Sequence, residues 1–216
     1  YLLSKTPLFI PLMQVTIRLP HKLVCYLTFS MFCIMGTYFG LHIDDSIANT
    51  RAIGAVLGGV LGGPSVGFLV GLTGGLHRYS MGGMTAMACM ISTVVEGLVG
   101  GLLHRYMLKN NRLDLLFQPL VIAAITFLAE CLQMLIILIV ARPFWEAEEL
   151  VENIALPMMI TNTVGAAMFM QISAGDLRKI YVGIFLQSAT NCSASRGGNA
   201  AGIQSKKQYE SCARAL

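Results

Sequence analysis

The sequence predicts an all-α fold, a polytopic bundle of transmembrane helices that contains a broken-helix hairpin rich in glycine and proline. Hydrophobic residues make up 55% of the chain and charged residues 12%, and the mean hydropathy is +0.67. Soluble domains carry about 25% charged residues, so this chain has about half the charge that a water-exposed surface needs. Its apolar residues also form long blocks. A helix needs about 20 such residues to cross a bilayer core about 30 Å thick.

Four apolar blocks meet that length, and a fifth differs from them. The four are 23–41, 83–103, 119–141 and 154–172. The fifth, 52–76, is crowded with glycine and interrupted by Pro64. A water-soluble bundle would place charged residues on one face of every helix, and these blocks do not.

We divide the chain on this basis into four parts. Residues 1–22 are expected to hold the remnant of a first span and a cytoplasmic loop, and 23–172 the multi-span membrane sensor domain. Residues 173–190 are expected to be a juxtamembrane cytoplasmic segment. The apolar pattern stops near residue 190, so 191–216 is predicted to be a disordered tail.

Loop charge predicts the topology. The connections 4–22 and 104–118 carry an excess of lysine and arginine and are therefore expected to be cytoplasmic. The connections 42–46 and 142–153 are acidic and are expected to be external loops. The chain must then cross the membrane an odd number of times between 42–46 and 104–118. Blocks 52–76 and 83–103 would give two crossings if each were a single span, so block 52–76 cannot be a simple single span.

The conflict disappears if block 52–76 turns back on itself at Gly-Gly-Pro, residues 62–64. Glycine and proline are the residues that such a turn needs. Bent backbone is tolerated at membrane depth where protein buries it, and the glycines that flank the turn allow close burial. We predict two separate helical arms, 52–61 and 65–76.

This hairpin would place two cations together at its external mouth, Arg51 before the first arm and Arg78 after the second. Guanidinium groups bind carboxylates in a bidentate manner and stay charged. Cys89 and Ser92, three residues apart, share a face of the next helix, and Glu96 lies one turn deeper. These residues predict a site for a small carboxylate. The alternative is that both arginines are interfacial anchors that extend to lipid headgroups.

Four further polar side chains fall inside the apolar blocks: Glu96, Glu130, Gln133 and Asn162. Such residues are costly in lipid and have functional or interhelical roles. We expect the last three to bridge neighbouring helices and leave both roles open for Glu96. The six cysteines form no C-x-x-C pair, and the sequence predicts no metal site, no cofactor and no nucleic-acid partner.

Three runs carry a resemblance to a known family: Asn-Thr-Arg-Ala-Ile-Gly at 49–54, Gly-Gly-Pro at 62–64 and Gly-Gly-Leu-His-Arg-Tyr-Ser at 74–80. The chain resembles, over about residues 4–170, the LytS/YehU-type (5TM-5TMR type) receptor region of sensor histidine kinases. That region is a multi-span module of the bacterial inner membrane. Within the family, the sequence is most similar to the pyruvate-sensing kinases of enteric bacteria.

The resemblance implies a ligand-sensing input domain of a two-component system that binds a small carboxylate, pyruvate, and relays to a cytoplasmic kinase region. It implies Arg51, Arg78, Cys89 and Ser92 as ligand-binding residues, and we expect Glu96, His77 and Asn49 to support them. The full-length form is expected to be a homodimeric histidine kinase that acts on a cognate response regulator. A transporter, or the small-molecule-binding subunit of one, is the alternative, and a fragment without signalling output is a third interpretation.

The C-terminal residues depart from the family, whose members continue into a GAF-like domain and a kinase region. Residues 202–213 do not resemble that continuation. We therefore expect a shift of reading frame near residue 190, giving a truncated product. The nucleotide sequence of the gene tests this expectation: an alternative frame there should encode a GAF-like continuation, and its absence would contradict the frameshift.

Overall fold

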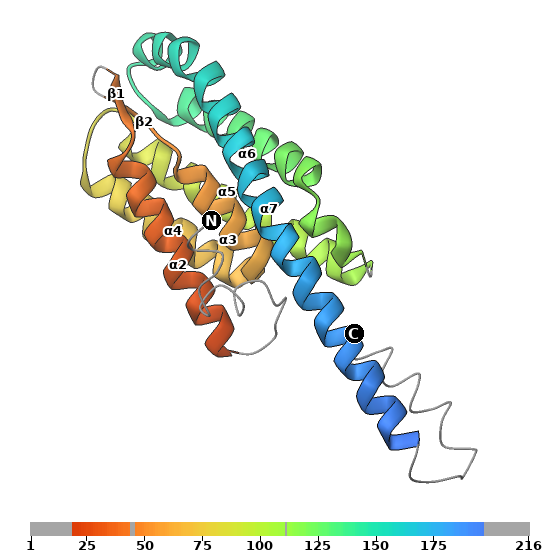
Figure 1. Cartoon of the computed structure of the whole chain (residues 1–216). Coiled ribbons are helices and arrows are strands. Elements are labelled where there is room, and N and C mark those ends of the chain that lie inside the picture. Colours follow the sequence, from red (N-terminus) through yellow and green to blue (C-terminus); the bar gives the residue numbers. More distant parts are fainter. Residues whose placement is uncertain (1–18, 44–45, 111, 197–216) are drawn as a thin grey trace. The chain divides into compact units, whose positions relative to one another are not determined.

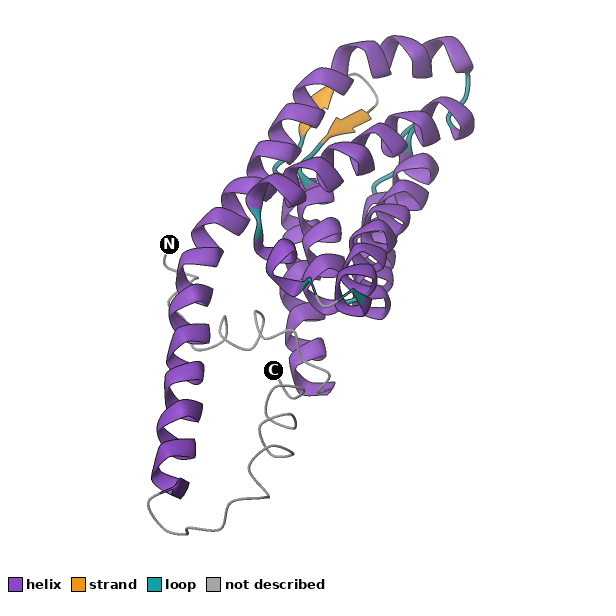
Figure 2. Ribbon diagram, turned by 90° about the vertical axis from the view of Figure 1, so that its right-hand side faces the viewer, coloured by secondary structure: helices purple, strands orange, loops and turns teal. Residues whose placement is uncertain are grey.

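The computed structural model describes residues 19–43, 46–110 and 112–196, and Figures 1 and 2 show that these residues are almost entirely helical. The elements are α2 (Leu19–Tyr38), β1 (Leu41–Ile43), β2 (Ser46–Ala48), α3 (Arg51–Gly62), α4 (Pro64–Ser80), α5 (Ala86–Lys109), the 3-10 helix η2 (Leu113–Phe117), α6 (Pro119–Val140) and α7 (Phe144–Arg196). The predicted all-α membrane bundle is confirmed. An antiparallel ribbon of the two three-residue strands joins α2 to α3.

Three of the four predicted spans lie in helices long and apolar enough to cross a membrane, whereas the span predicted at 23–41 corresponds to a shorter apolar helix that ends at Tyr38. α5, α6 and the segment Phe144–Ser173 of α7 are long and apolar enough to cross a membrane, and Lys22–Tyr38 and Arg51–Gly62 are shorter apolar helices. Among the described residues, those up to Gly175 form one compact unit and those from Asp176 a second. Most of the predicted 1–22 segment and most of the predicted tail lie outside the described residues.

The C-terminal part of the chain requires two corrections. The acidic segment 142–153, expected to be an external loop, instead forms the first turns of α7, which begins at Phe144. Glutamate, alanine and leucine are good helix formers, and carboxylates near a helix N-terminus interact favourably with its dipole. The helix also runs through 173–190 to Arg196, so the first six residues of the predicted disordered tail are helical.

The predicted bend in block 52–76 is confirmed. α3 ends at Gly62 and α4 begins at Pro64, so Gly63 alone separates them. Gly63 has φ +83°, a left-handed conformation that glycine adopts without strain, and Pro64 occupies the first turn of α4, where its missing N–H costs nothing. His104 Nδ1 lies 2.7 Å from the carbonyl oxygen of Val60, in the last turn of α3.

The two arms form an antiparallel hairpin. Gly58 lies against Val70, and Gly74, near the end of α4, lies against the side chain of Arg51 at the start of α3. Both arms pack on α5, and α2 packs on both arms. The first turn of α3 and the last turn of α4 therefore lie at one end of the hairpin.

Glycine allows the hairpin to approach α5 at backbone distance. A Cβ atom on Gly67 would overlap the carbonyl oxygen of Gly97, and a Cβ atom on Gly97 would overlap that of Gly67. A Cβ atom on Gly59 would also meet Gly97. Close helix packing through small residues is typical of membrane proteins. These contacts fix the position of both arms along the α5 axis.

A second packed region joins α6 and α7 to the start of α5. Met134 and Ile137 of α6 pack with Leu150 and Ile154 of α7, and Ala88 of α5 completes this cluster. Large apolar side chains also cover the outside of the helices, among them Leu120 at 81% and Leu156 at 68% exposed. Lipid covers such a surface in a membrane protein.

The glycine contact generates the first prediction. Gly97→Ala places a methyl group against the backbone of α4, which cannot yield as a side chain can, so overpacking should destabilise the chain by at least about 2 kcal/mol. Gly165→Ala is the matched control, because its Cβ meets only the far end of the Ile53 side chain. Thermal unfolding in detergent should show a clearly lower midpoint for Gly97→Ala. Equal midpoints for the two variants would contradict the backbone contact.

Candidate functional site

Arg51 is the first residue of α3 and is fully buried. Its backbone N–H donates to Asn49 Oδ1 at 3.1 Å, which holds the start of the helix, and its Nε donates to Thr93 Oγ1 on α5 at 2.6 Å. Nη1 and Nη2 are buried and have no hydrogen-bond partner among the described residues. A buried charge needs compensating partners, so this end of the guanidinium is the chemically unsatisfied part of the site.

Arg78 lies in the last turn of α4 and is also fully buried. Its Nη1 donates to the carbonyl oxygen of Gly82, and its Nη2 donates to Thr85 Oγ1 at 3.2 Å. Thr85 directly precedes α5. Both guanidinium groups are covered by protein, whereas an interfacial anchor would extend its charged end to the headgroups. The geometry therefore favours the site interpretation over the anchor interpretation.

The two arginines bind hydroxyl groups at the start of α5 and within it. Thr85 and Thr93 are eight residues apart, about 12 Å along the α5 axis. Cys89 lies midway between them and is buried. Ser92 is buried on the same helix, where its Oγ donates to the Cys89 carbonyl oxygen at 3.1 Å and lies 3.5 Å from Gln133 Oε1 of α6. The predicted cysteine and serine thus lie between the two threonines that hold the arginines.

Two buried carboxylates accompany Arg51. Glu96 of α5 is 1% exposed and Glu130 of α6 is 0% exposed. Both contribute to the electrostatic environment of Arg51. Both Glu96 oxygens and Glu130 Oε2 lack a hydrogen-bond partner within the described part of the chain.

Asn162 connects this group to α7. Its Nδ2 donates to Glu130 Oε1 at 2.7 Å and to the Asn49 carbonyl oxygen at 3.2 Å. The expectation that Glu130, Gln133 and Asn162 bridge helices is confirmed, because Gln133 Oε1 lies within hydrogen-bond distance of Ser92. Four helices, α3, α5, α6 and α7, thus contribute polar side chains to one buried region.

Not every predicted site residue joins this region by a hydrogen bond. Asn49 does, through both its side chain and its backbone. His77 is half-buried and packs edge-on against Tyr38, with ring centroids 5.2 Å apart. Sequence reasoning missed Thr93 and Thr85, which accept hydrogen bonds from the two arginines. The one signal for Thr93 was its place next to Ser92 and one turn after Cys89.

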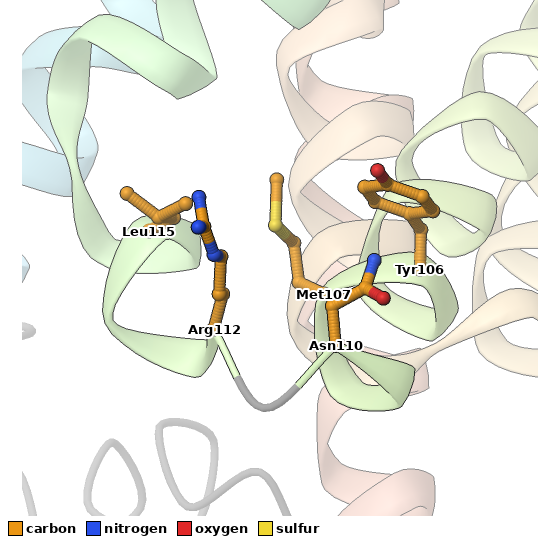
Figure 3. A pocket seen from close by; sticks show the side chains of 5 residues that line it. All are labelled: Tyr106, Met107, Asn110, Arg112 and Leu115. Atoms are coloured by element: carbon orange, nitrogen blue, oxygen red, sulfur yellow. The ribbon is translucent and has the colours of Figure 1, made fainter.

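A separate hollow of about 430 Å³ lies between the end of α5 and η2 (Figure 3). It is lined by Tyr106, Met107, Asn110, Arg112 and Leu115, none of which is a predicted site residue. The structure also contains, within the described residues, no group of three or more His, Cys, Asp or Glu side chains that could hold a metal ion. The polar region around Arg51, whose buried Nη groups have no hydrogen-bond partner among the described residues, is the candidate site.

Comparisons with known proteins agree with this fold. The family described as the 5TMR of 5TMR-LYT matches residues 6–175. The sensor histidine kinase BtsS of Escherichia coli (strain K12) is 65% identical over 92% of this chain and 36% of its own length. The sensor protein LytS of Bacillus subtilis (strain 168) is 37% identical over 83% of this chain and 32% of its own length. No solved structure matches the chain.

The chain spans about a third of the length of these curated relatives, and the matching part is their membrane sensing region. The relatives are sensor kinases, and the helices of this chain are those of a multi-pass inner-membrane protein. The chain therefore belongs to the 5TMR-LYT family of membrane receptor regions found in LytS-type sensor histidine kinases.

Proposed function

We propose that this chain is the ligand-sensing input region of a two-component sensor kinase, and that it binds a small carboxylate at Arg51. The observation that carries this proposal is the Arg51 guanidinium, which is fully buried while its Nη1 and Nη2 have no hydrogen-bond partner among the described residues. The two Nη groups present parallel N–H donors, the arrangement that a carboxylate accepts in a bidentate manner. In a dry interior this ion pair is far stronger than in water.

The other predicted residues give the ligand its identity. Cys89 provides a small apolar wall on α5, and the Ser92 hydroxyl, which donates its one proton to the Cys89 carbonyl oxygen in this structure, can turn to donate it to a second ligand oxygen beside the carboxylate. Arg78, held by Thr85 at the same end of the hairpin, adds a second positive charge. A small 2-oxo acid fits this set of groups, and the family resemblance implies pyruvate.

Binding at Arg51 can be passed to the output end of the chain through α7. The Asn49 side chain accepts a hydrogen bond from the backbone N–H of Arg51. The backbone carbonyl oxygen of Asn49 accepts a hydrogen bond from Asn162 of α7. A ligand that favours one position of α3 therefore also favours one arrangement of α7. In the full-length form this helix would bias the dimeric kinase region and hence the cognate response regulator.

The first prediction of this proposal concerns the arginines. Arg51→Ala and Arg78→Ala should each weaken pyruvate binding by about 2–5 kcal/mol, because a desolvated charge-assisted pair is lost. Isothermal titration of the purified chain measures this loss, with Arg105→Ala, an exposed arginine on α5, as the control. Unchanged affinity in both variants would reduce the arginines to structural residues. Uptake of pyruvate into liposomes that contain the parent chain would instead favour the transporter alternative.

A second prediction concerns selectivity for the oxo group. Ser92→Ala should weaken pyruvate binding by about 1 kcal/mol, the worth of one hydrogen bond, and should leave acetate binding nearly unchanged, since acetate lacks the second oxygen. Ser80→Ala, on the exposed end of α4, is the matched control. An equal loss for both ligands would show that Ser92 supports the site without contacting the ligand's oxo group.

A further inference from the structure

Arg51 is held at several points along its length. Its backbone N–H donates to Asn49 Oδ1 at 3.1 Å, and its backbone carbonyl oxygen accepts a hydrogen bond from Cys33 Sγ at 3.4 Å. Its Cδ lies 3.7 Å from the position that a Cβ atom on Gly74 would take, so the side chain passes directly over that glycine of α4. Its Nε donates to Thr93 Oγ1 at 2.6 Å. These contacts fix the side chain as far as Nε, and the Nη groups beyond it have no partner among the described residues.

The Thr93 hydroxyl is placed so that it can only accept a hydrogen bond from Arg51. The side chain is fully buried, and its Oγ1 donates its single proton to the Cys89 carbonyl oxygen, one turn earlier, at 2.7 Å. An oxygen lone pair is then left for the Nε proton. The backbone of Thr93 is fixed as well, since a Cβ atom on Gly71 of α4 would come within 2.5 Å of its carbonyl oxygen. Thr93 is therefore a rigid acceptor for Arg51.

A guanidinium group offers a carboxylate two bidentate edges. One edge is formed by Nη1 and Nη2, and the other by Nε together with one Nη, because all three nitrogens lie in one plane and carry protons. The hydrogen bond to Thr93 occupies the Nε proton of Arg51 and so removes the second edge. Arg78 shows the opposite arrangement, since Gly82 and Thr85 engage its Nη groups. Of the two arginines, Arg51 is therefore the one that presents the Nη1–Nη2 edge.

We propose that Thr93 is the positioning residue of this site: by occupying Nε of Arg51, it directs a carboxylate to bind end-on, with one oxygen on Nη1 and the other on Nη2. The inference rests on the proposed function and adds to it a residue that does not touch the ligand. A guanidinium that is already oriented loses no rotational freedom when the ligand arrives, which lowers the cost of binding. Without the hydroxyl, the end of Arg51 can turn, and the Nε edge becomes a competing place for the carboxylate.

Thr93→Val and Thr93→Ser separate the hydroxyl from the rest of the side chain. Valine keeps the shape and removes the acceptor, whereas serine keeps the acceptor and removes a methyl group. In isothermal titration, Thr93→Val should bind pyruvate about tenfold more weakly than the parent and Thr93→Ser within about twofold of it, because only valine loses the hydrogen bond to the charged group. Thr126→Val is the matched control, since Thr126 is equally buried and its Oγ1 has no partner among the described residues. Parent-like affinity in Thr93→Val, or an equal loss in Thr93→Ser, would overturn the positioning role.

A second measurement reads the mode of binding and does not depend on how well the valine variant folds. Solid-state NMR of the parent chain, with arginine labelled either at Nε or at Nη, measures the coupling of each to carboxyl-labelled pyruvate, and the part that Arg51→Lys removes belongs to Arg51. The coupling should be clearly stronger to Nη than to Nε in the parent and in Thr93→Ser. In Thr93→Val at saturating pyruvate, it should extend to Nε.

Two outcomes of this measurement contradict different claims. Equal coupling of bound pyruvate to Nε and Nη of Arg51 in the parent would overturn the end-on mode and leave the proposed function intact. Failure of pyruvate to bind the parent under any condition would contradict the proposed function and this inference together.

Discussion

The burial of one guanidinium, that of Arg51, is the constraint on which the rest of the polar interior depends. Its backbone is held by Asn49 and its Nε by Thr93, while Glu96 and Glu130 supply opposite charge. Breaking a buried set of charges by removing one member leaves the others uncompensated. These residues come from α3, α5 and α6, and Asn162 adds α7. The hydrogen bonds around Arg51 therefore also hold the helices in one arrangement.

The glycine contacts determine where that charge can lie. Because Gly67 and Gly97 meet backbone to backbone, the hairpin arms lie closer to α5 than side chains would allow. At this distance a side chain from the start of α3 reaches Thr93, and one from the last turn of α4 reaches Thr85. A chain with larger residues at the crossing would keep its arginines, but they could not reach both Thr93 and Thr85. The absence of side chains at the glycine crossing thus lets the helices come close enough for the arginine–threonine hydrogen bonds to form.

The features that the sequence predicted are local ones. The break at 62–64 follows from glycine and proline themselves, and the buried face of Cys89, Ser92 and Glu96 follows from helical spacing. The threonines that hold the arginines and the contact from Asn162 to Asn49 depend on how helices are rotated against one another, which spacing within one helix does not reveal. The acidic segment 142–153 was wrongly predicted to be a loop, because its charge was taken to indicate an exposed connection. The exposed beginning of a helix carries the same kind of charge, so charge alone does not distinguish the two.

The central claim is that a carboxylate contacts the free end of the Arg51 guanidinium, and a distance measurement tests it most directly. Solid-state NMR can detect the dipolar coupling between carboxyl-labelled pyruvate and nitrogen-labelled arginine in chain reconstituted into lipid. A contact shorter than about 4 Å should appear in the parent and in Arg105→Lys, and it should weaken in Arg51→Lys at a pyruvate concentration that still saturates the variant. Saturated binding of pyruvate without coupling to any arginine, or with coupling unchanged in Arg51→Lys, would contradict the claim.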